Sequence, residues 1–290
     1  MFLVIFADEC IMIGKTKPSG RRKEVFGLND HPDQQKERST KGEFSDKIGR
    51  LSRSEAYRNF CEEVYGYRMA LFNMMDREQL DFLYQSIAPA PADTILDLGC
   101  GNGSILNWLN RQSGCKGIGI DQLDCELFDS SNPSISYRKG DMEEIQTYEV
   151  HSDITISIDS LYFCKQPGAM LRYRYRNSRK GMYLFYSQYL FENEAEQREL
   201  LQSDGTRLAQ TLKRNGIPYA TIDYSKNERM LYTRALDTLR AYRHAFELEG
   251  NLDLVEQKFK EDLLGKQLYE EGRASRYLYR IPSPSEEREN

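Results

Sequence analysis

Three alternate glycines follow a short apolar run in the segment TILDLGCGNGS (94–104). Glycines between a strand and a helix let the backbone approach a ligand without a Cβ in the way. A dinucleotide fingerprint would place its third glycine at position 104, where this chain has Ser104, and no Gly-Lys-Ser/Thr of a phosphate loop follows. Asp97 would repel an anion and attract a cation. The segment therefore predicts a loop that binds a cationic ligand.

Acidic residues follow two further apolar runs. Asp121 ends the run GIGID (117–121), 22 residues after Gly99, and Asp141 follows the run SISYRKG. Each acid alone has an ordinary explanation as a helix N-cap or a turn residue. In an open α/β sheet, however, ligands bind outside the carboxyl ends of the strands. Three acids in register after three successive strands therefore indicate one binding site.

The segments that position these residues alternate between strand and helix patterns from Thr94 onward. This alternation predicts an α/β fold with a seven-stranded, mainly parallel sheet and helices on both faces. A long helical insertion is expected at about 228–272, with Leu231, Ala235, Leu239, Tyr242 and Phe246 on one face and Val255, Phe259 and Leu263 on another. The seven predicted strands are 94–98, 117–121, 134–141, 153–159, 182–190, 219–225 and 275–281.

The chain before this sheet divides into two parts. Residues 1–51 are expected to be a flexible tail, because residues 14–53 are rich in charged and small residues and show no helical or strand periodicity. A basic arm that contacts a partner, or an apolar anchor at residues 1–13, stays open as an alternative. Capping signals at Ser52 and Asp76 predict two helices, which together form a helical cap over residues 52–87. The α/β domain is expected over residues 88–290.

Composition argues against several classes of protein. The net charge is −5, and since the first 53 residues carry 11 Lys/Arg against 8 Asp/Glu, the remaining chain is acidic, unlike a general nucleic-acid binder. The longest apolar stretch, MFLVIFADECIMIG, is shorter than the roughly 20 residues that span a bilayer, and it lacks the marks of a secretory signal. Six cysteines without a C-x-x-C pair predict no zinc site and no disulfide framework. We therefore expect a cytoplasmic protein with no metal and no membrane partner.

At LDLGCGNG (96–103) the sequence resembles the class I S-adenosylmethionine-dependent methyltransferases, most clearly over about residues 90–190. The resemblance implies a Rossmann-like methyltransferase fold, S-adenosyl-L-methionine as cofactor and S-adenosyl-L-homocysteine as product. An ammonium and a sulfonium make an aspartate a suitable neighbour. The implied cofactor residues are Asp97, Gly99, Cys100, Gly101 and Gly103 around the methionine part, Asp121 and Gln122 at the ribose, Asp141 and Met142 at the adenine, and Asp159.

The fourth predicted strand ends at Asp159, and the residues after it should face the transferable methyl group. Related enzymes that methylate exocyclic amines of bases or glutamine amides have Asn-Pro-Pro-aromatic here, where this chain has Ile158-Asp159-Ser160-Leu161. The Pro-Cys dipeptide of the C5-cytosine enzymes is also absent from the sequence. These departures favour a small-molecule acceptor. The candidate general bases are Asp159, Tyr162 and His244, although His244 also fits a surface position on a helix.

We therefore expect methyl transfer to an O, N or C nucleophile of a small molecule, by a monomer or homodimer. Two alternatives stay open. An RNA-modifying methyltransferase requires the basic run Arg172–Lys180 and the tail to form one surface. A catalytically inert cofactor-binding subunit, which regulates a partner enzyme, requires a closed acceptor pocket. Candidate rings to hold a cationic or aromatic acceptor are Tyr65, Tyr67, Phe72, Tyr162, Phe163, Tyr186 and Tyr189.

Overall fold

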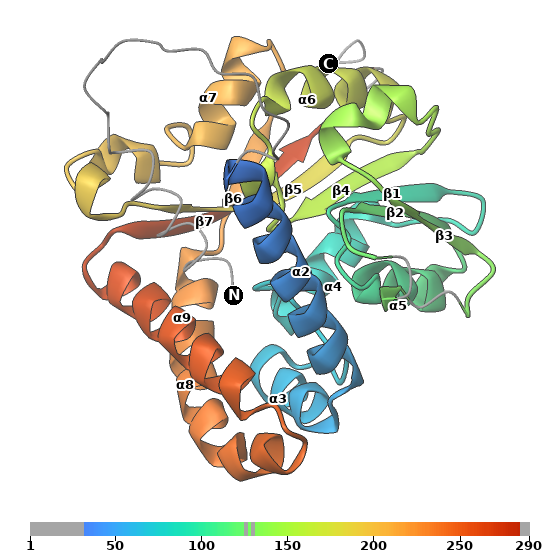
Figure 1. The fold of residues 1–290 in the computed structure, drawn as a ribbon. Helices are drawn as coiled ribbons and strands as arrows, with labels where there is room; N and C mark the ends of the chain where they lie inside the picture. The colour runs from blue at the N-terminus through green and yellow to red at the C-terminus, as the bar shows by residue number, and fades with distance from the viewer. Residues whose placement is uncertain (1–31, 125–126, 129–130, 285–290) are drawn as a thin grey trace, which may run out of the picture.

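Seven strands form a single sheet in the computed structural model, which describes residues 32–124, 127–128 and 131–284 (Figure 1). The strand order is β3-β2-β1-β4-β5-β7-β6. The first five strands pair in parallel, and β7 runs antiparallel to both β5 and β6. The predicted mainly parallel α/β fold is confirmed. The strands are β1 Thr94–Leu98, β2 Lys116–Asp121, β3 Ile135–Lys139, β4 Ile154–Ile158, β5 Met182–Tyr189, β6 Ala220–Asp223 and β7 Ala274–Ile281.

Alternate side chains of the central strands pack into two apolar cores, one on each face of the sheet. Ile95 of β1 packs in one core, and its neighbours Leu96 and Leu98 pack in the other. Both cores need apolar residues because helices cover both faces of a parallel sheet. One face carries α3 (Glu55–Tyr65), α4 (Arg77–Ile87), α5 (Ser104–Ser113) and α8 (Ser225–Leu248), and the other η2 (Met142–Thr147), α6 (Pro167–Asn177) and α7 (Arg207–Arg214) (Figure 1).

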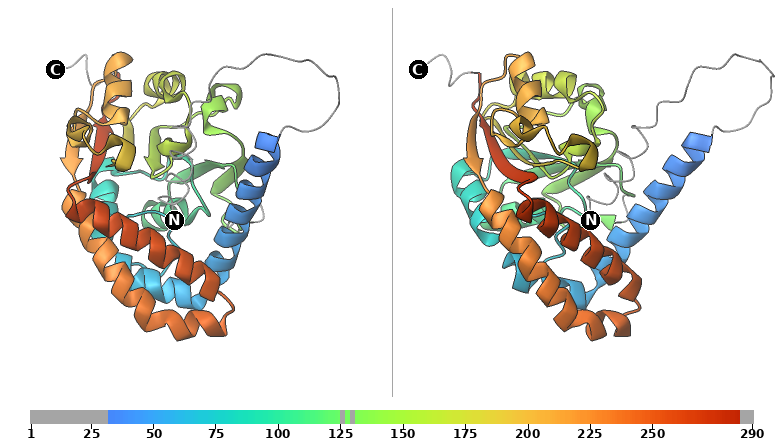
Figure 2. Two further views of the ribbon diagram at one scale, coloured as in Figure 1. Left: turned by 60° about the vertical axis from the view of Figure 1, so that its left-hand side comes forward. Right: turned by 90° about the vertical axis from the view of Figure 1, so that its left-hand side faces the viewer.

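The helical insertion between β6 and β7 consists of two antiparallel helices, α8 and α9 (Leu252–Glu270), which extend beyond the sheet beside α3 (Figure 2). The connection between them is three residues long. Tyr232 of α8 packs with Leu268 and Tyr269 of α9 in a small core of their own. Among the described residues, none of the helices has the length and apolar character needed to cross a membrane.

Two of the helices before β1, α3 and α4, are the pair that the capping signals predict. Asp76 accepts a hydrogen bond from the backbone N–H of Gln79 and caps α4 as expected. The predicted cap at Ser52 is wrong, because Ser52 lies within the preceding helix; the N-cap of α3 is Ser54, which accepts from the backbone N–H of Tyr57. The chain between these helices, residues 66–76, turns back toward the carboxyl ends of the strands.

Residues 32–51, expected as part of the flexible tail, belong to a helix, α2 (Pro32–Arg53). Ile48 and Leu51 of α2 are buried, and Lys47 Nζ lies 3.2 Å from Glu261 Oε1 of α9. These contacts join positions about 200 residues apart, so local periodicity does not reveal them. The expectation for residues 1–31 lies outside the described residues.

Candidate active site

The loops after β1, β2 and β3 meet at Asp121. Its Oδ2 accepts a hydrogen bond from Gly101 N at 2.8 Å, and its Oδ1 accepts one from Leu123 N at 3.0 Å. Its backbone carbonyl accepts from Gly140 N at 2.8 Å. Burial raises the pKa of Asp121, and the backbone N–H donors oppose that rise. The predicted acids therefore do come together at one edge of the sheet, and Asp121 also orders the loops that surround it.

The glycine loop between β1 and α5 needs glycine for two different reasons. Gly99 has φ +75°, and a Cβ there would overlap the side chain of Ser160. Gly101 has φ +57°, and its Cβ position has no atom within 4 Å. Both conformations are strained for other residues. Gly99 thus lets the loops after β1 and β4 touch, whereas Gly101 faces open space in which a ligand fits.

Asp97 is a buried acid near the glycine loop, and one of its oxygens has no hydrogen-bond donor among the described residues. The residue is 3% exposed, and within the described part of the chain its Oδ1 has no partner. Burial, with a smaller contribution from the charge of Asp121, raises the pKa of Asp97 to about 8. A buried carboxyl oxygen without a donor, beside an open glycine loop, suits a cationic group such as an ammonium. These residues therefore fit a cofactor that carries positive charge.

The predicted adenine and ribose residues lie beside this loop. Gln122 Nε2 donates to Asp141 Oδ2 at 3.3 Å, and Asp141 Oδ1 caps η2 by accepting from Glu143 N at 2.9 Å. Met142 is buried, and its Cε lies 3.1 Å from the Cβ position of Gly99. Asp121 and Asp141 thus both have the ordinary turn or capping role that the sequence left open, in addition to their place at the site.

Cys100 and Gly103 support the loop from the protein side. Cys100 is buried against Gly119 of β2, and burial raises the pKa of its thiol, which keeps it protonated. Gly103 is the N-cap of α5, where a Cβ would overlap the ring of Tyr137. Both residues shape the loop through packing.

Asp159 holds the loop after β4 in place with both carboxylate oxygens. Oδ1 accepts from Arg276 Nη1 at 2.6 Å and from the Tyr162 hydroxyl at 3.2 Å, and Oδ2 accepts from Met74 N at 2.9 Å. Its φ of +52° is unusual for a residue with a side chain. Such strain persists where surrounding bonds impose it, often at functional sites. Because its oxygens are already bound, the geometry favours a positioning role over that of a general base.

The other two candidate bases are not supported by the structure. The hydroxyl of Tyr162 also accepts from Ser187 N at 2.6 Å, and burial raises the pKa of this phenol, so it stays protonated near neutral pH. The side chain of His244 is 79% exposed on α8, next to Glu247. Since His244 does not line the pocket at Asp159, we withdraw it as a candidate.

A small pocket, with about 30 Å³ of free space, lies beside Asp159, between residues 71–74 and the α8–α9 hairpin. Four of the seven predicted aromatic residues line it: Tyr65, Phe72, Tyr162 and Tyr189. The other three lie elsewhere: Tyr67 packs edge-on against Trp108, Phe163 is 40% exposed, and Tyr186 is buried in the core against Tyr162. The pocket also includes Tyr57, Tyr232, Glu228, Lys258 and Asp262, which the sequence did not single out.

Behind the pocket lies a buried ionic network that sequence reasoning missed. Arg276 of β7, fully buried, donates to Asp159, to Ser187 Oγ at 2.9 Å and to Gln79 Oε1 at 2.8 Å. Glu228 of α8, also fully buried, accepts from Ser187 Oγ at 2.9 Å and from Tyr189 at 2.8 Å, and burial raises its pKa. Arg276 shares a strand face with the buried Leu278, which is the signal that could have marked it.

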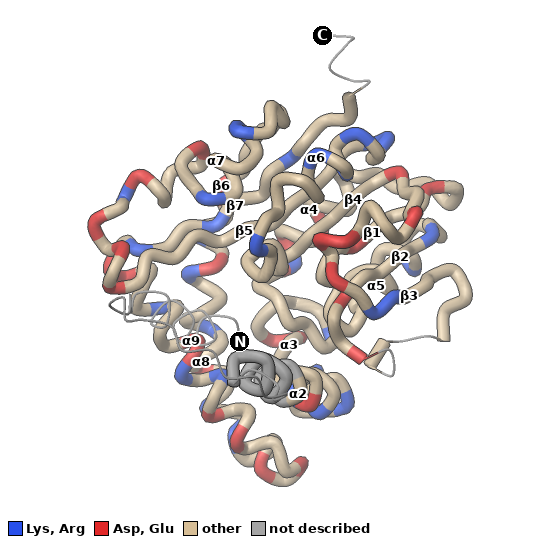
Figure 3. Tube along the Cα trace, turned by 45° about the horizontal axis from the view of Figure 1, so that its top comes forward, with Lys and Arg blue, Asp and Glu red and all other residues tan. Residues whose placement is uncertain are grey.

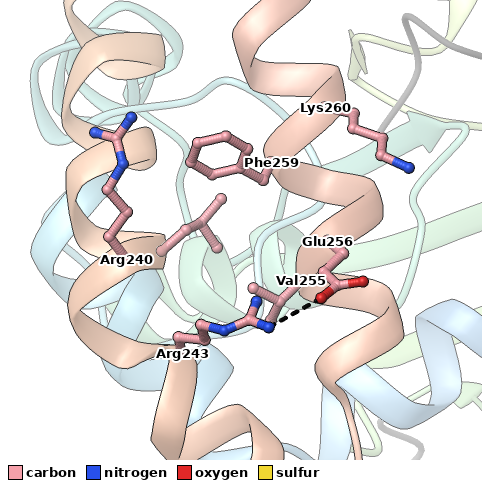
Figure 4. A pocket seen from close by; sticks show the side chains of 7 residues that line it. Arg240, Arg243, Val255, Glu256, Phe259 and Lys260 are labelled. Atoms are coloured by element: carbon pink, nitrogen blue, oxygen red, sulfur yellow. Dashed lines mark hydrogen bonds and ion pairs between the residues drawn. The ribbon is translucent and has the colours of Figure 1, made fainter.

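A second hollow lies on the outside of the α8–α9 hairpin (Figure 4). Arg240 lies over the ring of Phe259 at 5.1 Å, and Arg243 Nη2 pairs with Glu256 Oε1 at 3.0 Å. Its lining includes Leu239, Val255 and Phe259 from the predicted apolar faces of the insertion, but no residue that the sequence predicts for the cofactor or acceptor site. We assign it no function.

Taken together, these observations define an α/β fold with a glycine-rich loop and acidic residues at the carboxyl ends of β1 to β3, and a pocket beside β4. Residues 96–186 match the model of a family described as a methyltransferase domain. These residues of the chain therefore match a methyltransferase domain, and the resemblance at LDLGCGNG to the class I S-adenosylmethionine-dependent methyltransferases is confirmed at the level of family model and fold.

Solved structures share this fold at low sequence identity. The cyclopropane synthase MmaA2 from Mycobacterium tuberculosis matches with a TM-score of 0.61 at 11% identity, over 82% of this chain and 98% of that protein. A methyltransferase from Geobacter sulfurreducens with S-adenosyl-L-homocysteine matches with a TM-score of 0.52 at 14% identity, over 77% of this chain and 98% of that one. No curated protein sequence matches significantly.

A third similar structure was solved with two ligands bound. It is phosphoethanolamine N-methyltransferase 2 from Haemonchus contortus, in complex with phosphomonomethylethanolamine and S-adenosylhomocysteine. The TM-score is 0.64 at 14% identity, and the match covers 83% of this chain. This chain spans 60% of that protein's length. At such identities these matches establish the fold alone.

Proposed function

We propose that the protein is an S-adenosyl-L-methionine-dependent methyltransferase that acts on a small molecule. The observation that carries this proposal is the pocket at Asp159, which lies next to the loop after β4 and is lined by aromatic and ionisable side chains. An inert cofactor-binding subunit would not need such a pocket. The proposal covers O-, N- and C-methylation.

The cofactor, when bound, supplies a methyl group that its sulfonium already activates for displacement. Asp97 would hold its ammonium, and the loops around Asp121 and Asp141 would hold its adenosyl part. The protein's remaining task is to align the acceptor and to exclude water. Arg276 and Tyr162 serve alignment, because they fix Asp159 at the end of β4.

Residues 66–76 are placed to close the site. The carbonyl of Ala70 accepts hydrogen bonds from Asn102 Nδ2 at 3.2 Å and from Ser104 Oγ at 3.0 Å, both in or next to the glycine loop. Four residues further on, Met74 N donates to Asp159. This segment therefore bridges the predicted cofactor and acceptor sites, as expected of a helical cap that excludes water.

The RNA-modifying alternative gains no support from the basic run of α6. Its central arginine, Arg174, is fully buried and donates to Ser152 Oγ at 2.5 Å and to Thr155 Oγ1 at 3.2 Å. Burial lowers the pKa of this guanidinium to about 10. Over the trace of the described residues, Lys and Arg lie among Asp and Glu on most helices (Figure 3). These observations favour a small molecule over RNA as the methyl acceptor.

A thermal-shift titration with S-adenosyl-L-methionine, S-adenosyl-L-homocysteine and NAD tests the cofactor assignment. At a hundredfold excess over its Kd, a ligand adds about 2.7 kcal/mol, which corresponds to roughly 5–10 °C in Tm for a protein of this size. We expect both adenosyl compounds to raise Tm and NAD to leave it unchanged. A protein stabilised by NAD alone, or by none of the three, would contradict the proposal.

A further inference from the structure

The α9 helix turns two charged side chains toward the pocket. Lys258 Nζ pairs with Asp262 Oδ1 at 3.0 Å, and their side chains are 7% and 1% exposed. Oδ2 of Asp262 has no hydrogen-bond partner within the part of the chain that the structure describes. A buried carboxylate oxygen without a donor costs free energy unless a ligand satisfies it. Asp262 is one of the residues that line the pocket, which places its carboxyl group at the pocket wall.

The charges around the pocket leave room for one more cation. Three carboxyl groups line it, those of Asp159, Glu228 and Asp262, and Lys258 also lines it. Arg276 stands behind and bonds Asp159, with its Nη1 3.6 Å from Glu228. Three acidic groups thus face two basic ones, and burial raises the pKa of one of the acids, Glu228. A monocationic ligand adds no negative charge to this set, whereas a carboxylate or phosphate would place another anion beside the acids.

The walls of the pocket suit a cation as well. The pocket is lined by the rings of Tyr57, Tyr65, Phe72, Tyr162, Tyr189 and Tyr232. Ring faces attract ammonium groups, most strongly where water is excluded. Two independent features, an unsatisfied carboxylate oxygen and an aromatic lining, therefore select the same ligand chemistry.

We propose that the acceptor is a small amine that binds as a monocation, with its nitrogen against Asp262 Oδ2 and among the tyrosine rings. This inference rests on the methyltransferase function proposed above. For transfer, the ammonium gives one proton to a carboxylate of the pocket. The nitrogen lone pair then forms the N–C bond to the cofactor's methyl carbon as the C–S bond breaks, and the C–S electron pair stays on the sulfur of S-adenosyl-L-homocysteine.

Choline and its uncharged isostere 3,3-dimethyl-1-butanol test the proposal without any substitution. Choline cannot lose a proton from its nitrogen, so its binding reports the cation site and is independent of turnover. Calorimetry on the whole chain saturated with S-adenosyl-L-homocysteine should give choline at least a tenfold lower Kd than the alcohol. Equal affinities, or tighter binding of propionate than of choline, would overturn the proposal.

A variant pair assigns the effect to Asp262. We expect Asp262→Asn to abolish the preference for choline while the Kd of S-adenosyl-L-homocysteine changes less than twofold. Asp237→Asn, which neutralises an acid that is 73% exposed on α8, should keep the preference. A preference that survives Asp262→Asn overturns the role of Asp262. If S-adenosyl-L-homocysteine fails to bind the wild type, the methyltransferase function fails, and selective binding of choline would still support the cation site.

Discussion

Asp97, next to the last residue of β1, and Asp121, the last residue of the neighbouring β2, have different roles in the protein. Asp121 accepts two backbone N–H groups and so orders the loops, whereas one oxygen of Asp97 has no donor among the described residues. Sequence predicts both residues, because acids after successive strands form a recognisable pattern. It does not predict this division of roles, which depends on which N–H groups the folded loops present.

Gly101→Ala tests whether the open space beside the glycine loop is the cofactor site. Gly216 is a matched control, because it also has a positive φ (+62°) and no atom within 4 Å of its Cβ position. Each alanine should lower the free energy of unfolding by about 1 kcal/mol through backbone strain. Calorimetry should show at least a tenfold loss of S-adenosyl-L-homocysteine affinity for Gly101→Ala alone. Equal affinities in the two variants would place the cofactor elsewhere.

Asp121→Ala tests the ribose assignment. Lost charge-assisted hydrogen bonds to the ribose hydroxyls, together with freed Gly101 and Leu123 N–H groups, should weaken cofactor binding by about 1–3 kcal/mol. Asp124→Ala is the control, since Asp124 lies in the same turn and pairs with Lys139 on the surface. The assignment is wrong if calorimetry gives the same S-adenosyl-L-homocysteine Kd for both variants.

At the scale of elements, the strands were predictable and the inward face of α9 was not. Short apolar runs define all seven strands to within a few residues, because a parallel sheet covered on both faces needs them. For α9, the expected apolar face included Leu263, which is 48% exposed, while Lys258 and Asp262 are buried. Charged residues are buried there because they pair across one helical turn, and a hydrophobic periodicity cannot anticipate that pairing.

Gly265→Ala tests the close contact of α8 and α9. A Cβ at Gly265 would overlap the ring of Tyr232, which also lines the acceptor pocket. We expect the free energy of unfolding to fall by about 1–3 kcal/mol, because the ring must shift in a packed core. Gly42→Ala in α2, where a Cβ meets no atom within 4 Å, should instead raise it by about 0.5–1 kcal/mol. Chemical denaturation measures both, and stabilisation by Gly265→Ala would refute the contact.

At the scale of the whole molecule, segments near both ends of the described chain are held in place by long-range ion pairs and hydrogen bonds. Arg50 of α2 bonds Asp253 Oδ1 of α9 at 2.7 Å, and Lys47 pairs with Glu261. Arg276 of β7 reaches Gln79 of α4 and Asp159 after β4. These links join segments more than 100 residues apart, which explains why the sequence predicted the strands of the sheet but left residues 32–51 in a tail.

The buried carboxyl group of Asp97 makes the stability of the protein depend on pH. Its pKa is about 8 in the folded state against an ordinary value of 3.8. Between these values the unfolded chain has lost the proton that the folded chain keeps, so this group makes stability fall as pH rises from about 4 to 8. Buried Glu228 contributes in the same direction, so only part of the slope belongs to Asp97.

Asp97→Asn removes the contribution of Asp97 to this pH dependence of stability, because an amide does not titrate. The free energy of unfolding of the variant should therefore exceed that of the wild type by an amount that grows by about 4 kcal/mol between pH 5 and pH 8, which raises its relative Tm by roughly 8–16 °C. The same substitution should weaken S-adenosyl-L-homocysteine binding and abolish the proton that the wild type releases on binding at pH 7, since a bound ammonium favours the ionised carboxylate. Proton release is read from binding enthalpies in buffers of different ionisation enthalpy. Parallel Tm curves and unchanged proton release would show that Asp97 is ionised in the free protein and does not meet the ammonium.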